Sequence, residues 1–551
     1  MKKYITYTLI NLITITWLFA DYDVHTDELS GDYSNESHVD SVWDNAWVKS
    51  DTTVIFSKNG TNYTRASFKY TNLTNASFYK ANLTDANFDA TILDNVDFTD
   101  AIIKGAKFLN VVTQYYRGGQ ITSEQLYSTA SYKNKDLRGV GFSCHDLTGY
   151  DFSGQDLTGA NFMSAILSNV NFSNAKIDGA DFSQSFSTAA LTKEQLYSTI
   201  SYKNKNLSGI VFSYTDMRGW DLSDQNLTGA TFMFVDMNDI DLTNSIINNV
   251  KFVAETSRGF TKEKLYSTAS YKNKDLTGID FSGASGYDYN SLWNCDFSSQ
   301  NLSNTNFSGI PLNGSSLTNS NLRGANLEYA DLTSVDLRGA ILDGPIDTPF
   351  YKNTIMTDGE IKNFSMSSAE DNFSIRKYEP VTAGGAIINA KIVEDAKIIS
   401  GGAVLTLEEG AVLEISAGKT LTVSGDGEIV FDVDAAADDT NIILNSGSKL
   451  VFGDNSKLTI NLTGEVSETD PLHFTVIKVA EDSYVLGLDT LPKDNIILNV
   501  NGTEYDSSKW GINFDPTTGT LDISVNIPEP ATCATIFTVL ALGFAAYRRR
   551  K

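Results

Sequence analysis

The chain has 551 residues and a net charge of −26, from 42 lysines and arginines against 68 aspartates and glutamates. This length allows several domains. Such acidity argues against nonspecific binding of nucleic acid through its phosphates. It suits a soluble surface protein or one that binds cations.

The N-terminal segment has the pattern of a secretory signal. Met1, Lys2 and Lys3 precede an apolar run that ends at Ala20. A short basic start followed by such a run predicts a signal peptide over residues 1–20, with an uncleaved anchor as the alternative. Residues 21–60 are acidic and predict a spacer and an N-terminal cap. We therefore expect the protein to be exported.

A period of five residues dominates residues 61–345. A large apolar residue recurs at every fifth position, and a small one such as Ala66 or Thr71 usually stands two positions before it. Helices repeat at about 3.6 residues and strands at 2, so a period of five predicts a chain that turns a corner every five residues, as in a solenoid. The inward positions expected to form its core include Phe68, Leu73, Phe78, Leu83, Phe88, Phe98, Phe142, Phe152, Phe162, Phe172, Phe212, Phe232, Phe252 and Phe281.

These repeats resemble the pentapeptide-repeat family, whose unit reads Ala-Asp/Asn-Leu-x-x. The closest copies are residues 81–85, 325–329 and 330–334. The resemblance implies a right-handed quadrilateral β-helix with four pentapeptides per coil. No proline occurs before Pro311, which is consistent with a need for backbone N–H groups throughout the ladder.

A longer period lies on top of the short one. Residues 126–137 recur with few changes at 196–207 and 265–276, after Thr122, Thr192 and Thr261 respectively. Thr followed three residues later by Gln, in the first two copies, is typical of a helix N-cap. We predict three short helical insertions. They form either a partner surface or inherited spacers from a duplicated cassette, and we favour the second interpretation.

Three bulky residues stand where Ala or Thr is usual. His145, Tyr150 and Trp220 occupy positions for small inward side chains. We expect them to distort the coil locally, and a binding groove is the alternative.

The pattern changes after residue 345. We expect a linker over residues 346–372 and a second all-β domain over residues 373–526. Short alternating segments such as 403–407 and 419–423 lie there between Gly-rich turns. They resemble the β-solenoid passenger regions of bacterial surface proteins. A β-sandwich is the alternative, particularly for residues 473–525.

The C-terminal segment resembles the PEP-CTERM sorting signal over residues 527–551. Pro528, Glu529 and Pro530 precede a mostly apolar stretch, which is followed by Arg548, Arg549, Arg550 and Lys551. The stretch is at the low limit for spanning a bilayer, and the basic residues should stay cytoplasmic. The resemblance implies that an exosortase-type membrane enzyme processes the chain, which the membrane holds through its C-terminal helix until then. A plain tail anchor is the alternative.

Candidate chemistry is sparse. His25, His38, His145 and His473 show no metal-ligand spacing, and the neighbours Cys144 and His145 should point to opposite faces. We expect no disulfide between Cys144 and Cys295, no catalytic residue and no cofactor. Asp432, Asp434, Asp438 and Asp439 supply oxygens that suit calcium, although a solvated acidic loop is the favoured explanation.

The sequence thus favours a non-enzymatic exported scaffold, a surface or extracellular-matrix protein. Extracellular polysaccharide or surface proteins are its candidate partners, and nucleic acid is not. One alternative is a β-helix enzyme acting on polysaccharide, but such enzymes need a cluster of Lys, Arg, Asp or His that we do not find. The other is a DNA-mimicking topoisomerase inhibitor, a role known for some pentapeptide-repeat proteins, which the export segments contradict.

Overall fold

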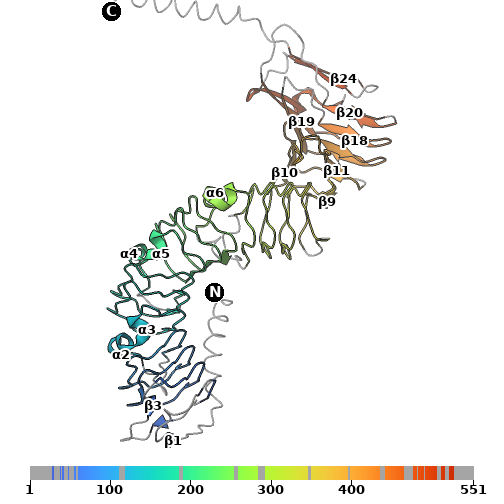
Figure 1. Ribbon diagram of the computed structural model, residues 1–551. Coiled ribbons are helices and arrows are strands. Elements are labelled where there is room, and N and C mark those ends of the chain that lie inside the picture. The colour runs from blue at the N-terminus through green and yellow to red at the C-terminus, as the bar shows by residue number, and fades with distance from the viewer. Residues whose placement is uncertain are drawn as a thin grey trace, which may run out of the picture. The chain divides into compact units, whose positions relative to one another are not determined.

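The chain divides into two compact units in the computed structural model. Unit 1 comprises residues 1–273 and 279–286, and unit 2 comprises residues 274–278 and 287–551 (Figure 1). The division falls inside the repeats and not near residue 345. The structure describes residues 28–29, 38, 40–42, 47–48, 55–57, 60–110, 118, 120–184, 190–253, 259–282, 292–344, 346, 349–394, 397–434, 441–464, 476–480, 482–488, 490–504, 510–515 and 520–525.

Unit 1 is built from coils of four pentapeptides. Parallel bridges join Asn62 to Asn82 and Ser67 to Asn87, so each position of the repeat pairs with the fourth repeat after it. Each corner needs a left-handed residue, such as Asn75 with φ 63° or Gly105 with φ 69°. Gly, Asn and Asp tolerate this conformation best, which explains their frequency at that position of the repeat.

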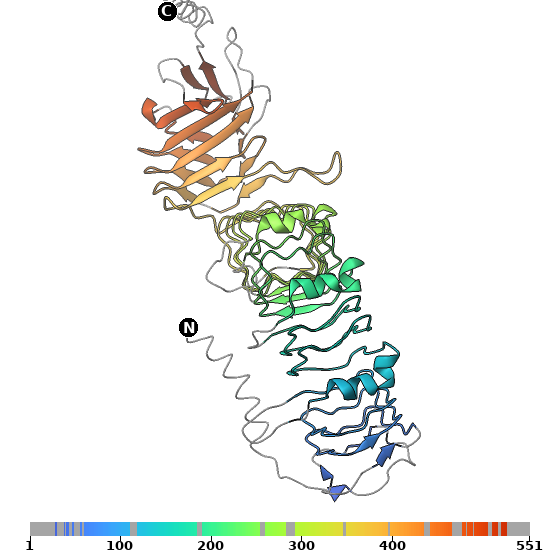
Figure 2. The same cartoon turned by 90° about the vertical axis from the view of Figure 1, so that its left-hand side faces the viewer.

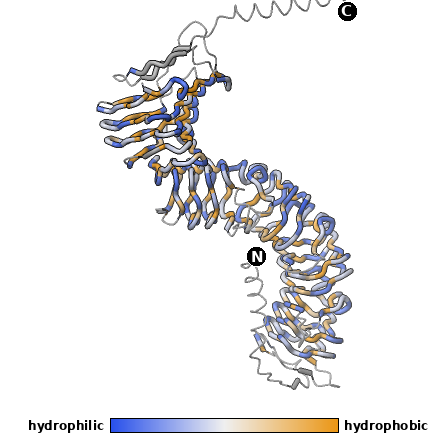
Figure 3. Tube along the Cα trace, turned by 180° about the vertical axis from the view of Figure 1, so that it is seen from behind, coloured by the Kyte–Doolittle hydropathy of each residue, from blue (hydrophilic) through white to orange (hydrophobic). Residues whose placement is uncertain are grey.

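The apolar positions point into the coils. All fourteen predicted core residues are at most 1% exposed. Phenylalanines one coil apart stack, with ring centroids 5.1 Å apart for Phe68 and Phe88 and 5.2 Å for Phe88 and Phe108. Figure 3 shows the resulting alternation of apolar and polar residues along each coil. Stacked aromatic rings add to the stabilisation from burial alone.

Most rungs of the coils, meaning the short extended segments that pair from one coil to the next, are single bridges. The longer ones are the parallel pairs β1–β2 and β3–β4 and the parallel sheet β5–β6–β7. Their bounds are Glu28–Leu29 (β1), Trp47–Val48 (β2), Ile55–Ser57 (β3), Ser77–Phe78 (β4), Val211–Ser213 (β5), Thr231–Met233 (β6) and Lys251–Val253 (β7). The backbone N–H of His38 bonds to the carbonyl of Asn62, so pairing to the coils begins within the predicted spacer and cap.

Three helix pairs interrupt the coils, which confirms the predicted insertions. They are α2 (Ser123–Ser128) with α3 (Ala130–Lys133), α4 (Lys193–Ser198) with α5 (Ile200–Lys203), and α6 (Lys262–Ser267) with α7 (Ala269–Lys272). The ladder resumes after each pair, as between Lys107 and Gly141 and between Asp181 and Val211.

Unit 2 begins with further coils of the same kind, such as the rungs at Asn301 and Asn321. The ladder then continues through the segment predicted to be a linker, because Asp331 pairs with Phe350 and Asp336 with Ile355. Pro349 does not break it. It aligns with Ala330, whose N–H bonds to Leu327 within its own coil. The described part of 346–372 therefore extends the solenoid, with β8 (Thr354–Ile355) and β9 (Ile361–Lys362) as a small hairpin.

The rest of unit 2 is a solenoid with three sheets. Strands β10 to β22 pair in parallel in the orders β10-β13-β16-β19-β22, β11-β14-β17-β20 and β12-β15-β18-β21. This confirms the β-solenoid, and the β-sandwich is wrong for these strands. Alternate side chains face the core, as in β13 and β15. The bounds are Asn372–Ile375 (β10), Ala390–Ile392 (β11), Lys397–Ile399 (β12), Val404–Leu407 (β13), Leu413–Ile415 (β14), Thr420–Val423 (β15), Glu428–Asp434 (β16), Ile442–Leu444 (β17), Lys449–Phe452 (β18), Lys457–Thr463 (β19), Ile477–Val479 (β20), Tyr484–Leu486 (β21) and Ile496–Val500 (β22).

Antiparallel pairs follow this solenoid. The 3₁₀-helix η2 (Lys493–Asn495) leads into β22, which pairs with β23 (Thr503–Glu504). Strand β24 (Trp510–Asp515) pairs with β25 (Thr520–Val525). Among the described strands after β9, only these pairs depart from the parallel pattern.

Candidate functional surface

The helix pairs are the most regular feature of the surface, and their first helices begin at capped threonines. Thr122 Oγ1 accepts the N–H of Gln125 at 3.2 Å, while Gln125 Oε1 accepts the N–H of Thr122 at 2.9 Å. Thr192 and Gln195 repeat this reciprocal box. In the third copy Lys264 replaces Gln, so only the contact from the Lys264 N–H to the Thr261 hydroxyl remains. The box is thus present in the two copies for which the sequence predicts it.

A second cap follows at once, and the sequence analysis did not predict it. Thr129 Oγ1 accepts the N–H of Tyr132 at 3.1 Å, and Thr199 and Thr268 act likewise. The signal was present as the Thr inside the repeated Tyr-Ser-Thr segment. Each insertion is therefore two short helices joined at a capped corner.

In the first two insertions, the hydroxyls of two tyrosines bond to backbone groups of the next coil. The rings of Tyr127 and Tyr132 pack at 4.5 Å, and those of Tyr197 and Tyr202 at 4.4 Å. The Tyr127 hydroxyl accepts the N–H of Asp151 at 2.7 Å, and the Tyr132 hydroxyl donates to the Asp151 carbonyl at 2.8 Å.

Tyr197 and Tyr202 hold Asp221 in the same way, at 2.6 and 3.0 Å. The hydroxyl pair therefore supplies the partners that a neighbouring rung would give. Burial first, and the Asp151 carboxylate second, raise the pKa of Tyr132 to about 12, and burial and Asp221 do the same for Tyr202.

The helix pairs recur on one side of unit 1 at a constant interval. The Ala130, Ile200 and Ala269 N–H groups bond to the coil below, at the carbonyls of Ala101, Ala175 and Ser245. Between successive pairs lie two ordinary rungs, Asp151 with Asn171 and Asp221 with Asp241. Each pair thus follows the last after three rungs, or about 14 Å at the usual strand spacing. Figures 1 and 2 show the pairs along this side of unit 1.

Each insertion ends in an exposed basic turn. Residues 133–135 and 203–205 read Lys-Asn-Lys, and residues 272–273 supply the same Lys-Asn in unit 1; all are exposed. We call these three turns the basic tips. Lys133 pairs with Asp100 at 2.7 Å and Lys205 with Asp224 at 2.8 Å. Lys203 and Lys272 donate to the side-chain oxygens of Asn174 and Asn244 at 2.8 Å.

A family model describes the coils. The model "Pentapeptide repeats" matches in eight copies, over residues 59–85, 81–111, 136–184, 206–244, 290–319 and 312–344. The chain contains pentapeptide repeats. No curated protein matches the chain.

Solved structures are similar to this chain only at low identity. One is HetL from the cyanobacterium Nostoc sp. strain PCC 7120, a pentapeptide repeat protein involved in heterocyst differentiation regulation. It is 18% identical, with a TM-score of 0.12 over 59% of this chain and 93% of HetL. Another is QnrB1, a plasmid-mediated fluoroquinolone resistance protein, 13% identical with a TM-score of 0.09 over 57% of this chain and 91% of QnrB1. At these scores neither match says what this chain does.

The bulky residues of the pentapeptide coils do not open a groove. His145 is fully buried, Tyr150 is 8% exposed and Trp220 is 5% exposed. On the side of the next coil the ladder continues, since Leu147 N–H bonds to Ile166 O at 3.0 Å and Leu222 N–H to Asp241 O at 2.9 Å. On the other side the tyrosine hydroxyls hold the backbone of Asp151 and Asp221. The expected local distortion of the coil stays a prediction.

His145 and Tyr150 instead receive the segment that enters α2. His145 Nε2 accepts the Ile121 N–H at 3.4 Å, and the Tyr150 hydroxyl donates to Ile121 O at 2.9 Å. Burial lowers the pKa of His145 to about 4. The neutral imidazole thus satisfies the backbone N–H of Ile121, and the Tyr150 hydroxyl satisfies its carbonyl.

The candidate catalytic and metal-binding residues are not brought together among the described residues. Cys144 is exposed while His145 points inward, so the two side chains lie on opposite faces of the coil. Asp432 accepts the amide of Asn461 at 2.8 Å, while Asp438 and Asp439 lie outside the described residues. Within the described ranges no three His, Cys, Asp or Glu residues are placed to hold a metal.

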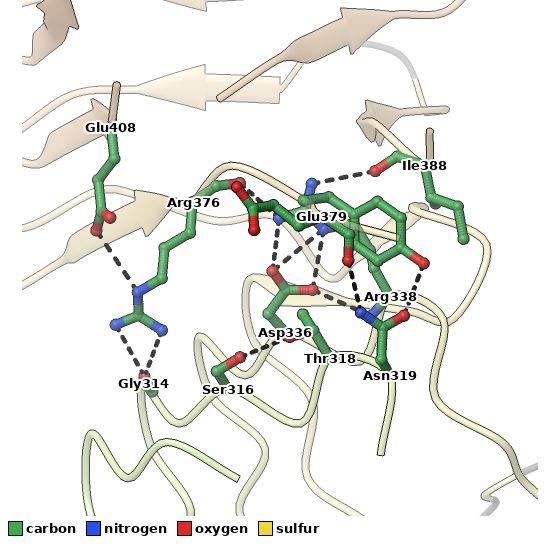
Figure 4. Close-up of polar contacts among 11 residues, drawn as sticks. Gly314, Ser316, Thr318, Asn319, Asp336, Arg338, Arg376, Glu379, Ile388 and Glu408 are labelled. Carbon is green, nitrogen blue, oxygen red and sulfur yellow. Dashed lines mark hydrogen bonds and ion pairs between the residues drawn. The ribbon is translucent and has the colours of Figure 1, made fainter. Parts of the chain in front are cut away.

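Unit 2 contains a buried ionic cluster that sequence reasoning missed. Arg338 and Asp336 form an ion pair at 2.6 Å with side chains only 1% and 6% exposed. Arg338 also donates to the carbonyls of Arg376 at 2.6 Å and Ile388 at 3.1 Å (Figure 4). The ring of Tyr378 lies against its guanidinium. Within unit 2, one arginine thus joins the last pentapeptide coils to the segment between β10 and β11.

Neighbouring contacts reinforce that junction. The Tyr378 hydroxyl donates to Asn319 Oδ1 and the Asn319 amide donates to Glu379 O, both at 2.8 Å. Arg376 reaches Gly314 O and pairs with Glu408 at 3.6 Å. Arg-Gly after Asp-Leu reads as an ordinary solvated position in the repeat, so the sequence carried no signal for this burial.

The predicted sorting residues Pro528, Glu529, Pro530, Arg548, Arg549 and Arg550 lie outside the described residues. In the described part of the chain no helix is long and apolar enough to cross a membrane. The sorting signal and its processing enzyme therefore stay predictions.

Proposed function

We propose that this pentapeptide-repeat protein is a non-enzymatic scaffold that is exported and sorted at the cell envelope. The observation that carries the proposal is the order of three elements in the tail, namely Pro528-Glu529-Pro530, an apolar stretch and a tetrabasic cluster. Such a stretch is a marginal span whose basic flank favours the cytoplasm. The basic start and apolar run of residues 1–20 support the same direction of transport.

The use of polar side chains in the described residues supports a scaffold over an enzyme. The repeated tyrosines hold backbone groups of Asp151 and Asp221, and Gln125 Nε2 donates to the carbonyls of Leu93 and Val96 at 2.8 and 3.0 Å. His145 is neutral and serves Ile121. A polysaccharide-cleaving enzyme needs a perturbed acid or base that faces a cleft, and these groups face the core or the ladder.

The DNA-mimic alternative has less support than the scaffold. A mimic of DNA needs a continuous run of negative charge. The acidic columns of unit 1 are stacked aspartates, such as Asp136 with Asp156 and Asp221 with Asp241, and the exposed lysines of the basic tips add positive charge to the same unit. Export would also separate the protein from any cytoplasmic topoisomerase.

Fractionation of the native host and mass spectrometry of the mature chain test the proposal. The expected wild-type protein lies outside the cytoplasm and lacks its last two dozen or so residues. Replacement of Pro528, Glu529 and Pro530 by Ala should leave an unprocessed precursor in the membrane, because the span and the basic cluster remain. The matched control replaces Pro492 and Glu504 by Ala and should be processed normally.

Two results would contradict the proposal. Wild-type protein found only in the cytoplasm would exclude export. An intact 548–551 segment on protein recovered from the cell surface would exclude processing and leave a plain tail anchor.

A further inference from the structure

We infer that the row of basic tips on unit 1 binds an extended glycan whose acidic sugars are separated by neutral ones. The inference deepens the proposed function, because it names the class of partner that such an exported scaffold would meet. It depends on the charge, the rigidity and the spacing of the tips.

Positive charge in unit 1 is concentrated in the insertions. Within unit 1, sequence positions 122–135, 192–205 and 261–273 hold eight lysines and three glutamates. The remainder of residues 61–273 and 279–282 holds 11 lysines and arginines against 19 aspartates and glutamates. The insertions are therefore net positive in a unit whose remaining charge is net negative. An anionic ligand should be attracted to the insertions.

The tips are held rigidly and alike. The Asn134 N–H bonds to Ala130 O at 2.9 Å and the Lys135 N–H bonds to Tyr132 O at 3.0 Å. Residues 204–205 repeat these bonds at 2.9 Å each, and Asn273 bonds to Ala269 O at 2.8 Å. Lys135 and Lys205 share a left-handed φ of 58° and 57°. The backbone of the tips therefore has little conformational freedom left to lose when a ligand binds.

The tips face one side of the unit at a constant interval. Three rungs separate successive tips, or about 14 Å. A ligand that bridges all three must therefore be extended over roughly 30 Å, and its second and third contacts form at high effective concentration. Individually weak sites then give appreciable avidity.

The acidic residues on the rungs between the tips determine how densely charged a ligand can be. Asp151 and Asp221 lie on these intervening rungs, next to the insertions. Duplex DNA carries one charge per about 1.7 Å of its axis and would place phosphates over these carboxylates. A polymer with sparse carboxylates can place one at each tip and neutral sugars between them. The partly exposed rings of Tyr132 and Tyr202 add apolar surface beside the tips.

A second copy of this chain is the competing occupant. Its acidic columns would share the rung spacing of the tips, but a net charge of −26 on each copy opposes the approach of two copies. A sparsely charged glycan brings far less like charge to the same surface. The glycan is therefore the better match.

Binding of defined polymers to the purified full chain tests the inference. Hyaluronan, in which acidic and neutral sugars alternate, is the main probe; alginate, acidic at every sugar, neutral dextran and duplex DNA are the comparisons. We expect hyaluronan to bind most tightly, with affinity falling as salt rises. Chains that span three tips should bind roughly 100-fold tighter than a disaccharide.

A matched pair of variants assigns the binding to the tips. The tip variant carries Ser at Lys133, Lys135, Lys203, Lys205 and Lys272. The control carries Ser at Lys80, Lys104, Lys107, Lys176 and Lys251, which makes the same change in net charge within unit 1. We expect the tip variant to lose roughly tenfold or more in affinity and the control about twofold or less. Both should melt near the wild-type temperature, because the tip lysines are exposed.

Several outcomes would overturn the inference. These are equal loss in both variants, tighter binding of alginate or DNA than of hyaluronan, and no length dependence. Self-association at low salt that only the tip variant loses, without glycan binding, would assign the row to a second copy. These assays use purified protein, so their failure is separate from a failure of export in the host.

Discussion

In the pentapeptide coils, most successive rungs lie four repeats apart where no helix pair intervenes, as from Asn62 to Asn82. In the three-sheet solenoid the interval between paired strands is uneven. It lengthens from the pair Val404 and Glu428 to the pair Glu428 and Lys457, and again to the pair Leu458 and Ile496. Both regions stack coils around an apolar core. They differ in what keeps the stack in register.

The difference comes from the corners. A pentapeptide coil turns after every five residues through a left-handed residue, so an added residue would shift every later side chain between core and solvent. The three-sheet solenoid has strands of three to seven residues, and its loops absorb extra length between them. The first region therefore tolerates whole inserted cassettes at one corner, and the second tolerates loops of many lengths.

The largest expected effect comes from charge in either core. Phe88→Asp in the pentapeptide coils and Leu421→Asp in the three-sheet solenoid each bury a carboxylate at a side chain at most 1% exposed. Each should cost more than about 4 kcal/mol in the free energy of unfolding. Hydrogen exchange should show the loss of protection in unit 1 for the first and in unit 2 for the second. Equal loss across both would contradict the division into two units.

The matched surface control for Phe88→Asp is Asp94→Ser. Asp94 is exposed, so its replacement should change stability by less than about 0.5 kcal/mol. Asp89, the residue next to Phe88, is unsuitable, because its carboxylate accepts the Leu109 N–H at 3.0 Å. Comparable melting of Asp94→Ser and Phe88→Asp would refute the assigned register.

The next effect is expected where the two kinds of coil meet within unit 2. Arg338→Ala leaves Asp336 buried without its partner and frees two carbonyls, which should cost about 3 kcal/mol or more. Arg323→Ala breaks an exposed pair with Asp343 and should cost less than about 1 kcal/mol. Chemical denaturation with exchange measured over residues 376–389 checks both. A small effect of Arg338→Ala would show that the coils are joined without this cluster.

His145 is a titratable group in the core of the pentapeptide coils, and it predicts a pH dependence. Its pKa in the folded chain is about 4, below the ordinary 6.5, because burial disfavours the imidazolium. Stability from this group is full above pH 6.5 and is lost as the pH falls toward 4. The loss should reach about 2 kcal/mol at pH 5. In His145→Gln the same titration of unfolding free energies should lack this component; an unchanged slope would contradict the assignment.

The smallest effect concerns the helix pairs. Tyr132→Phe removes the hydroxyl that donates to the Asp151 carbonyl and should cost about 1 kcal/mol. Because the folded pKa of Tyr132 is about 12, the stability that it gives is present below pH 10 and is lost as the pH rises through 12. Tyr214→Phe, at a side chain 55% exposed, serves as the control. Identical thermal melts of the two variants at pH 8 would argue against the tyrosine clamp.

The sequence predicts the pentapeptide coils in detail because one period governs both core and corner. Residues such as Phe68 and Asn75 reveal their roles by position alone. The three-sheet solenoid was predicted only as a class, because its uneven coil lengths hide which strands lie above one another. Pairs such as Val404 with Glu428 follow from tertiary stacking and not from any fixed interval.

The polar contacts were less predictable than the core. The Thr122 cap depends on two residues three positions apart, so the sequence predicts it. The Tyr127 and Tyr132 hydroxyls act on Asp151, and Arg338 acts on Ile388, at sequence distances that no local pattern encodes. Their roles depend on which coil lies next to which. The basic tips form a row because three rungs separate successive insertions, and only the pairing of the coils shows this interval.

The helix pairs also carry a consequence for how such a chain changes length. Residues 126–137 and 196–207 are nearly identical and occupy equivalent corners three coils apart. Genetic recombination between them would remove or add one whole cassette at a stroke while every remaining rung kept its neighbour. The helix-pair insertions are thus both the most similar stretches of sequence and the places where coils can be added or removed. The number of coils can therefore vary in whole steps of three.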